Sequence, residues 1–260
     1  GITDTGTGTT TYSVFDGTFN GNNIRSASAL SITGPASTVY MAGTAGSGNG
    51  ATAGVRSGTV AGGSSSQISG ATVTNFRNVK ALDFGGNEQV WASSNSGAAN
   101  GLNLITGSGF TTVIAPTLIT GINIYDFYFA DDRTLYLADE RATGGLYKLT
   151  RSGGDADDPS TGTWAVVYNT PIAPVTGTTN AGLRGLVGEN VGGTVNLFGI
   201  TTDNRLVSYS ELLGAGSASS FNTLATAGTN FAFRGIAGHG GPAGPGRAAG
   251  GASSSRLSDH

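Results

Sequence analysis

Two closely similar segments lie fifty residues apart near the end of the chain. Residues 181–188 read Ala-Gly-Leu-Arg-Gly-Leu-Val-Gly, and residues 231–238 read Phe-Ala-Phe-Arg-Gly-Ile-Ala-Gly. Each copy follows a stretch rich in Thr, Asn and Gly. A hydrophobic-Arg-Gly-hydrophobic segment that recurs at this spacing is typical of the blades of a β-propeller. The repeat therefore predicts an all-β fold built from similar units.

Alternation of apolar and polar residues predicts four strands in each unit. Two neighbouring strands separated by Gly, Asn or Asp form a hairpin, so each unit forms a four-stranded antiparallel blade. The expected strands are 23–32, 38–41, 54–57 and 71–74; 79–84, 89–92, 102–106 and 110–114; 124–129, 134–138, 144–150 and 163–168; and 183–188, 194–200, 205–210 and 221–225.

A fifth inner strand is expected at 233–237, so the chain predicts four blades plus one inner strand. Two arrangements fit this count. Residues 10–15 could supply an outer strand that closes a five-bladed ring, or the chain could be part of a larger propeller. We assign residues 1–237 to the propeller domain and 238–260, a Gly/Ala/Ser-rich segment, to a C-terminal tail or linker.

Composition excludes several classes of function. The net charge of −3 and the lack of a basic stripe with interleaved aromatic residues argue against nucleic acid as a partner. No apolar run is long enough to span a bilayer. The chain has no Cys, which excludes disulfides and thiolate chemistry. With only 11% charged residues and 45 Gly, the strands are expected to be paired throughout.

The segments Asn22-Asn23-Ile24-Arg25 and Phe233-Arg234-Gly235-Ile236-Ala237 carry a resemblance that extends over residues 13–237. The sequence resembles exported bacterial β-propeller proteins of unknown function, many of which end in a surface-sorting tail. The resemblance implies an extracellular or cell-surface location in a bacterium and no particular reaction. The segment 238–260 departs from it, because it lacks the Pro-Glu-Pro motif, apolar helix and basic end of a sorting signal.

One basic residue recurs near the start of the inner strands. Arg25, Lys80, Arg184 and Arg234 are placed at nearly equivalent positions, with Tyr125 as the exception. Radial repetition would bring them into a ring at one mouth of the central channel. Such a ring could bind an anion or an acidic glycan. Alternatively, each cation could bind carbonyls or an acid of the neighbouring blade, for which Asp83 and Asp126 are candidates.

A second candidate is the acidic hairpin that contains Asp155, Asp157 and Asp158. Hard cations prefer carboxylate oxygens, so this hairpin could hold Ca²⁺, although it lacks the spacing of a twelve-residue calcium loop. An acidic turn that bonds to its own backbone is the plainer interpretation.

Catalysis has few candidates, and we assign no catalytic residue. The two histidines lie in or beside the tail, at His239 and His260, which disfavours a Ser-His-Asp relay. The sequence thus predicts a secreted or cell-surface structural or binding module, which could assemble with copies of itself or with an extracellular matrix polymer. The alternative is a channel-centred metal-dependent hydrolase or lyase that uses Asp83, Asp126 and Glu189, with Asn123.

Overall fold

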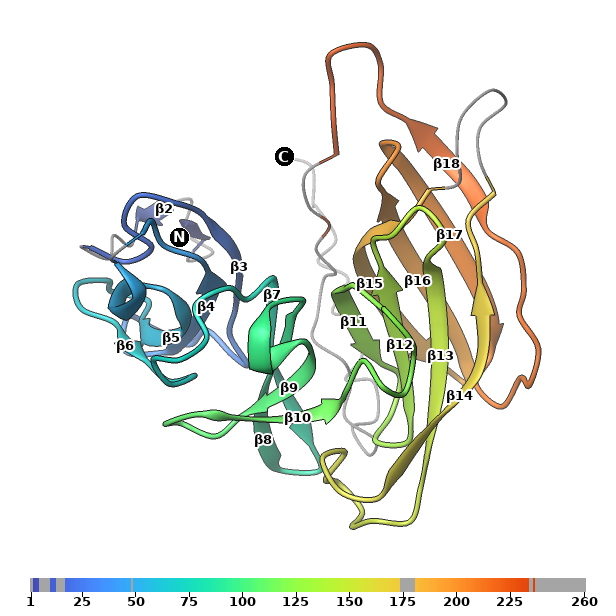
Figure 1. Ribbon diagram of the computed structural model, residues 1–260, viewed down its shortest axis with the longest axis horizontal. Helices are drawn as coiled ribbons and strands as arrows, with labels where there is room; N and C mark the ends of the chain where they lie inside the picture. Colours follow the sequence, from blue (N-terminus) through green and yellow to red (C-terminus); the bar gives the residue numbers. More distant parts are fainter. Residues whose placement is uncertain are drawn as a thin grey trace, which may run out of the picture.

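The computed structural model describes residues 2–4, 10–12, 17–47, 49–173, 181–233 and 236. It contains four antiparallel four-stranded sheets arranged as a four-bladed β-propeller (Figure 1). In every sheet the strands are paired in chain order. The predicted fold class, a propeller of four-stranded antiparallel blades, is therefore confirmed.

The blades are numbered along the chain. Blade 1 contains β3 (Ile24–Ser28), β4 (Thr38–Gly43), β5 (Gly54–Thr59) and β6 (Ser66–Gln67); blade 2 contains β7 (Asn78–Phe84), β8 (Asn87–Ser94), β9 (Gly101–Ile105) and β10 (Phe110–Ile114); blade 3 contains β11 (Ile124–Phe129), β12 (Thr134–Asp139), β13 (Gly145–Ser152) and β14 (Thr163–Thr170); and blade 4 contains β15 (Leu183–Val191), β16 (Thr194–Thr201), β17 (Arg205–Leu212) and β18 (Asn222–Thr226). Two short 3₁₀ turns, η1 (Gly50–Thr52) and η2 (Gly97–Ala99), precede the third strands of blades 1 and 2.

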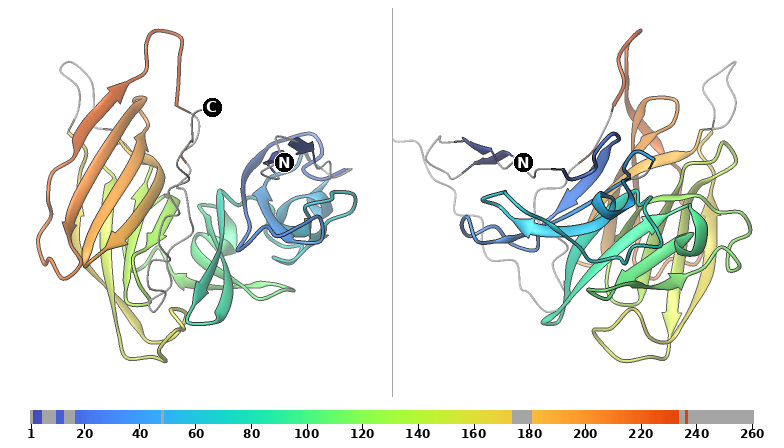
Figure 2. Two further views of the ribbon diagram at one scale, coloured as in Figure 1. Left: turned by 180° about the vertical axis from the view of Figure 1, so that it is seen from behind. Right: turned by 60° about the vertical axis from the view of Figure 1, so that its left-hand side comes forward.

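The sheets follow one another in space in the same order as in the sequence. Strand β3 lies beside β7, β8 lies beside β11, and β11 lies beside β15. Blades 1 and 4 therefore occupy the two ends of the series, as the views in Figure 2 also show. The innermost strand of each blade is its first strand.

One predicted strand was wrong. The fourth strand of blade 1 is β6 rather than residues 71–74, of which 71–72 form a turn and 73–74 are irregular. The apolar signal at 71–74 comes from Val73, which is buried in the core between blades 1 and 2 without pairing to a strand. The sequence pattern did not predict β6 because this strand is two residues long and lies in a Ser-rich stretch with few residues of high β-propensity.

The two arrangements expected for the propeller, a closed five-bladed ring or part of a larger propeller, depend on residues near the chain ends. Strand β2 (Thr10–Tyr12) pairs with β1 (Ile2–Asp4) as a separate two-stranded sheet, and it does not extend a blade. Residues 13–15, most of the expected inner strand at 233–237, and the tail 238–260 lie outside the described residues.

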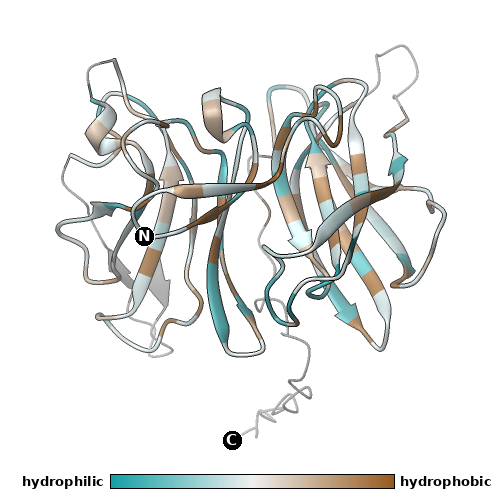
Figure 3. Ribbon diagram, turned by 60° about the horizontal axis from the view of Figure 1, so that its bottom comes forward, coloured by the Kyte–Doolittle hydropathy of each residue, from teal (hydrophilic) through white to brown (hydrophobic). Residues whose placement is uncertain are grey.

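The core consists of apolar layers between neighbouring blades. Figure 3 shows apolar residues along the strands of all four sheets. The largest layer joins blades 2 and 3, where the Phe129 ring lies 5.0 Å from that of Trp91 and 5.3 Å from that of Phe84, measured between centroids. Since interior blades bury both faces of their sheets, apolar residues occur on both faces of blades 2 and 3.

Blades 3 and 4 share a buried ion pair as well as an apolar layer. Lys148 on β13 and Glu211 on β17 are each 1% exposed, and Lys148 Nζ lies 2.7 Å from Glu211 Oε1. The Lys148 ammonium also donates to the carbonyls of Leu213 and Ala215, each at 2.8 Å. The hydroxyls of Tyr136, Tyr168 and Tyr209 all donate to the Glu211 carboxylate. This network fixes blade 4 against blade 3.

Candidate functional site

The inner strands of three blades carry a β-bulge at the second residue. The pairing register shifts at Arg25 between β3 and β4, at Tyr125 between β11 and β12, and at Arg184 between β15 and β16. A bulge inserts one unpaired residue and bends its strand, so it redirects the side chain of that residue. The structure thus gives the residues at this position a shared backbone geometry.

In blade 2 the equivalent residue is Arg77, not Lys80. Asn78 pairs with Ser93 and Asp126 of blade 3 pairs with Ala138; Ser93 and Ala138 are each the second-last residue of the second strand of their blade. Asn78 is therefore equivalent to Asp126, and Arg77, which precedes Asn78, is equivalent to Tyr125. The Arg77 backbone N–H donates to the Ser93 carbonyl at 2.8 Å. The predicted alignment of Lys80 with Arg25 and Arg184 was therefore wrong by three residues.

Arg77 and Lys80 carry the same charge, so charge did not distinguish them in the sequence. Each of the three bulge residues and Arg77 follows an apolar residue, in the pairs Ile24-Arg25, Phe76-Arg77, Ile124-Tyr125 and Leu183-Arg184. The repeated element is therefore an apolar residue followed by the residue at this position; in blade 2 both Phe76-Arg77 and Val79-Lys80 match it, and only the strand pairing distinguishes them.

Arg77 and Arg184 converge on Tyr125 and on Glu140, the residue that follows β12. Arg77 Nη1 lies 2.6 Å from Glu140 Oε1, and Arg184 Nε lies 3.4 Å from Glu140 Oε2. The guanidinium carbons of Arg77 and Arg184 lie 5.2 and 5.9 Å from the centroid of the Tyr125 ring. We call Arg25, Arg77 and Arg184, together with Tyr125 and Glu140, the arginine cluster.

The arginine cluster has more positive than negative charge. Burial lowers the pKa of the Arg77 guanidinium; Glu140 opposes this effect, and the charges of Arg25 and Arg184 lower the pKa further. Repulsion of this kind requires Arg25 and Arg184 to lie near Arg77. The cluster contains three arginines and one carboxylate, and two of the arginines pair with that carboxylate, so its formal charge is +2. The Arg184 side chain is 47% exposed and can reach a ligand from solvent.

Glu140 is held in place from the side of blade 3. The Asn123 amide donates to Glu140 Oε1 at 2.9 Å, and the Glu140 side chain is 10% exposed. The Asn123 Oδ1 atom is buried and has no hydrogen-bond partner among the described residues. The carboxylate therefore braces Arg77 and Arg184. Arg77 also donates from Nε to Asn95 Oδ1 at 3.2 Å, so the more exposed Arg184 has the most N–H groups left to donate to an anion.

Lys80 points into contacts between the inner strands of three blades. Its Nζ atom lies 2.9 Å from Asp126 Oδ1, and it donates to the Leu186 carbonyl at 3.0 Å and to the Phe127 carbonyl. Asp126 Oδ2 in turn accepts the Leu186 backbone N–H at 2.8 Å. These are the bonds to a neighbouring acid and to carbonyls that the structural interpretation of the basic residues expected, with Asp126 as the acid.

Arg234 lies outside the described residues, so its place in the ring stays a prediction. Ile236, two residues later, is described and lies against β15. An ideal Cβ built on Gly185 would be 3.2 Å from Ile236 Cγ2. The absence of a side chain at Gly185 therefore leaves room for the Ile236 side chain beside β15.

The acidic hairpin of blade 3 packs against the β7–β8 turn of blade 2. Asp158 Oδ1 accepts hydrogen bonds from Gln89 Nε2 at 2.8 Å and from Ser160 Oγ at 2.6 Å. Burial alone would raise the pKa of Asp158, but these hydrogen bonds outweigh burial and lower it. The backbone carbonyls of Asp155 and Asp158 both accept from Arg151 Nη1 at 3.0 Å. Arg151 thus stabilises the hairpin by donating hydrogen bonds to its backbone carbonyls.

The carboxylate of Asp157 faces blade 2, since an ideal Cβ on Gly85 would be 2.5 Å from Asp157 Cγ. Among the described residues, no group of three or more His, Asp or Glu side chains could hold a metal ion. A Ca²⁺ site made by Asp155, Asp157 and Asp158 therefore stays a prediction, because the described side chains do not gather into a set of metal ligands.

The acids of the hydrolase alternative have separate roles. Asp83 accepts the Gly86 backbone N–H at 2.6 Å in the β7–β8 turn, Asp126 binds Lys80, and Glu189 accepts from the Asn196 amide at 3.4 Å. Asp83 and Glu189 lie toward the ends of β7 and β15, whereas Asp126 lies near the start of β11. The residues described here do not form a joint acid–base site.

Comparisons with known proteins identify no family. No protein-family model matches the chain, and no curated protein matches it. One similar solved structure is the extracellular domain of a protein described as a hybrid two-component system from B. thetaiotaomicron; it has a TM-score of 0.46 and 13% identity and covers 77% of this chain. Another, described as the extracellular domain of a one-component system from the same organism, has a TM-score of 0.44 and 14% identity and covers 73%.

In both comparisons the chain spans 22% of the length of the solved structure. Among the described residues of the chain, no helix is long and apolar enough to cross a membrane.

Proposed function

We propose that the chain is a propeller-type binding module that captures an anionic group at the arginine cluster. The observation that carries this proposal is the convergence of the Arg77 and Arg184 guanidiniums on Tyr125 and on the single carboxylate of Glu140, with the charge of Arg25 close enough to affect Arg77. Guanidinium groups present paired N–H donors that match carboxylate, sulfate and phosphate oxygens. A ligand with one or more such groups would take the remaining donors.

The arrangement favours binding over chemistry. A fixed Glu140 holds two of the arginines in position, which reduces the conformational entropy lost when an anion binds. The described part of the cluster includes no nucleophile paired with a general base. We propose in addition that the module acts outside the bacterial cell, on the strength of the sequence resemblance to exported propellers. Labelling of intact cells that express the full gene with a membrane-impermeant reagent would test the location.

The binding proposal is tested with small anions. Citrate, inorganic sulfate and inorganic phosphate should each perturb the NMR signals of Arg25, Arg77 and Arg184, and binding should weaken as salt shortens the Debye length to about 8 Å at 0.15 M. Arg184→Gln should lower the affinity for citrate by about tenfold, since a hydrogen bond to a charged group is worth about 1.5–3 kcal/mol.

Arg133→Gln is the matched control. The Arg133 side chain is 50% exposed, close to the 47% of Arg184, and Arg133 lies outside the arginine cluster. It should leave citrate binding unchanged. If none of the three anions binds at low ionic strength, or if both variants weaken binding equally, the proposal fails.

Self-association and attachment to a matrix polymer stay predictions. Light scattering coupled to size-exclusion chromatography would detect assembly of copies of this chain, and a strict monomer at high concentration would contradict it. Co-sedimentation with an acidic polymer would test matrix attachment, and it should require Arg184 if the arginine cluster mediates it.

A further inference from the structure

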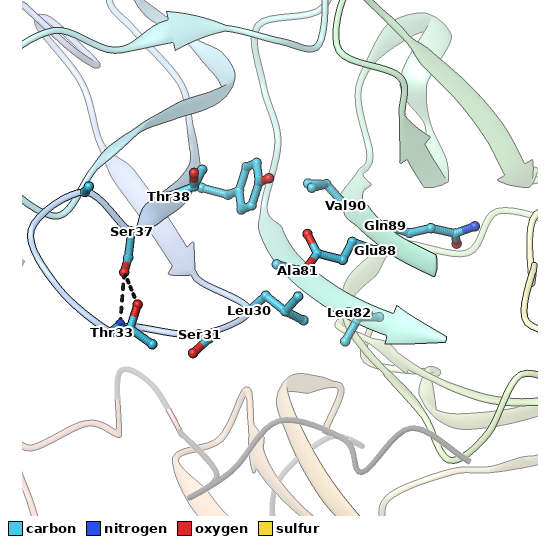
Figure 4. Close-up of a pocket in the computed structure, with 12 residues that line it drawn as sticks. Leu30, Ser31, Thr33, Ser37, Thr38, Ala81, Leu82, Glu88, Gln89 and Val90 are labelled. Carbon is cyan, nitrogen blue, oxygen red and sulfur yellow. Dashed lines mark hydrogen bonds between the residues drawn. The ribbon is translucent and has the colours of Figure 1, made fainter. Parts of the chain in front are cut away.

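A pocket of about 400 Å³ lies between blades 1 and 2. Blade 1 contributes the segment from Leu30 to Tyr40, and blade 2 contributes Ala81 and Leu82 from β7 and Glu88–Val90 from β8 (Figure 4). Arg25 stands near the start of β3 and Leu30 just past its end. Five residues of extended chain separate them by about 16 Å. The pocket is therefore distinct from the arginine cluster and lies toward the opposite end of the inner strands.

The blade 1 wall of the pocket is rich in hydroxyl groups. Ser31, Thr33, Ser37 and Thr38 all line it. Ser37 Oγ accepts the backbone N–H groups of Thr33 at 2.9 Å and Gly34 at 3.2 Å, so it fixes the loop between β3 and β4. The loop therefore presents its hydroxyl groups in a defined arrangement before any ligand arrives, which lowers the entropic cost of binding.

The blade 2 wall combines one carboxylate with apolar side chains. Glu88 is exposed and makes no ion pair or side-chain hydrogen bond with a described residue, while Val90 supplies apolar surface beside it. Leu30, 37% exposed, extends the apolar surface on the blade 1 side. Of the residues that line the pocket, Glu88 alone is charged. An anionic ligand would therefore be repelled.

Tyr40 provides a partly buried aromatic ring in the same pocket. Burial raises the pKa of the Tyr40 hydroxyl, and the nearby Glu88 carboxylate raises it further. The hydroxyl thus stays protonated as a hydrogen-bond donor at neutral pH. The ring can pack against C–H groups while its hydroxyl end, Glu88 and the Ser and Thr hydroxyls engage polar groups.

We propose that this pocket binds a neutral saccharide. A sugar ring offers hydroxyl donors to a free carboxylate, hydroxyl acceptors to Ser and Thr, and an apolar C–H face to Tyr40 and Leu30. The volume lies within the range of about 300–1,000 Å³ that is usual for small-molecule sites. A metal ion would require several carboxylate or carbonyl ligands, whereas the lining side chains supply one carboxylate. This inference goes beyond the proposed anion site and does not depend on it.

The test uses ¹⁵N-labelled protein and a panel of neutral tetrasaccharides built from β-glucose, α-glucose, β-mannose and β-xylose. At least one should shift the amide signals of Thr33, Tyr40 and Glu88. Tyr40→Ala should lower the affinity by at least about tenfold and Glu88→Gln by about fivefold, because each removes one of the two main contacts. Glu189→Gln is the matched control, since Glu189 is also an exposed glutamate on a blade strand, and it should change nothing.

Tyr40→Phe guards against loss of folding, because it retains the ring and the packing against the core while removing the hydroxyl. It should retain affinity to within about threefold. Arg184→Gln should leave saccharide binding intact, so failure here is distinguishable from failure of the anion site. If no tetrasaccharide shifts the pocket signals at about 20 mM, a concentration above the ~1 mM dissociation constant of weak binding, the proposal is overturned. Shifts confined to other surfaces would overturn it as well.

Discussion

Replacement of Lys148 by Met tests whether the buried ion pair holds blade 4 against blade 3. The Lys148 ammonium uses its three protons on Glu211, Leu213 and Ala215, and the side chain is 1% exposed. Methionine preserves most of the length and volume of lysine but supplies no donor. The substitution therefore leaves a buried carboxylate without its cation and two carbonyls without their donor.

The expected loss is about 3 kcal/mol of unfolding free energy. Removal of one partner from a buried ion pair costs about 3–5 kcal/mol because the other charge is left uncompensated. The lower end of this range applies here, since the hydroxyls of Tyr136, Tyr168 and Tyr209 still donate to the Glu211 carboxylate. Equilibrium urea denaturation followed by circular dichroism would measure the change.

A double-mutant cycle separates this ion pair from general loss of packing. Glu211→Gln combined with Lys148→Met removes both charges and keeps an oxygen acceptor for the tyrosines. The double variant should be less destabilised than the sum of the single variants, by about 1–3 kcal/mol. Arg133→Met removes an exposed cation and should cost less than about 0.5 kcal/mol. A loss below about 1 kcal/mol for Lys148→Met, or strict additivity in the cycle, would show that the ion pair does not hold blade 4 against blade 3.

Three further predictions concern contacts between blades. Asp126→Asn should lower the unfolding free energy in urea by about 2–3 kcal/mol, because it leaves the Lys80 ammonium without its anion; an unchanged midpoint would contradict this. The lowered pKa of Asp158 means that this carboxylate stabilises the fold above its ordinary pKa of about 3.9 and loses that contribution as pH falls through its lower folded value. Thermal melts from neutral to acidic pH should therefore show a shallower decline for Asp158→Asn. Gly85→Ala should cost about 1–2 kcal/mol, because residue 85 has a φ of +65° and the new methyl would meet the Asp157 carboxylate; equal melting temperatures would contradict it.

The blades could be predicted from the sequence because their signals are local. Strand alternation, glycine-rich turns and a repeated Arg-Gly segment all lie within single units, and the strand order of all four blades agreed with them. The one misplaced strand, β6, is short and polar, whereas Val73 carries an apolar signal that arises from packing between blades.

The arginine cluster could be predicted only in part. Arg25 and Arg184 were identified from their repeat position, but Lys80 was chosen over Arg77 because the inner strand of blade 2 was expected to begin at residue 79, and the pairing register was not known. That register is set by hydrogen bonds between β7 and β8, which no single strand encodes. Glu140, which braces two of the arginines, lies outside the repeat and gives no periodic signal.

The repeating unit follows from the amino-acid sequence alone, since each blade is formed by neighbouring strands whose turns and apolar spacing lie within one stretch of chain. Which side chains meet between blades depends on the tertiary structure. Lys148 and Glu211 are 63 residues apart, and Arg184 and Glu140 are 44 apart. Such contacts depend on how whole sheets pack against each other, and the spacing of residues within one blade does not specify that packing.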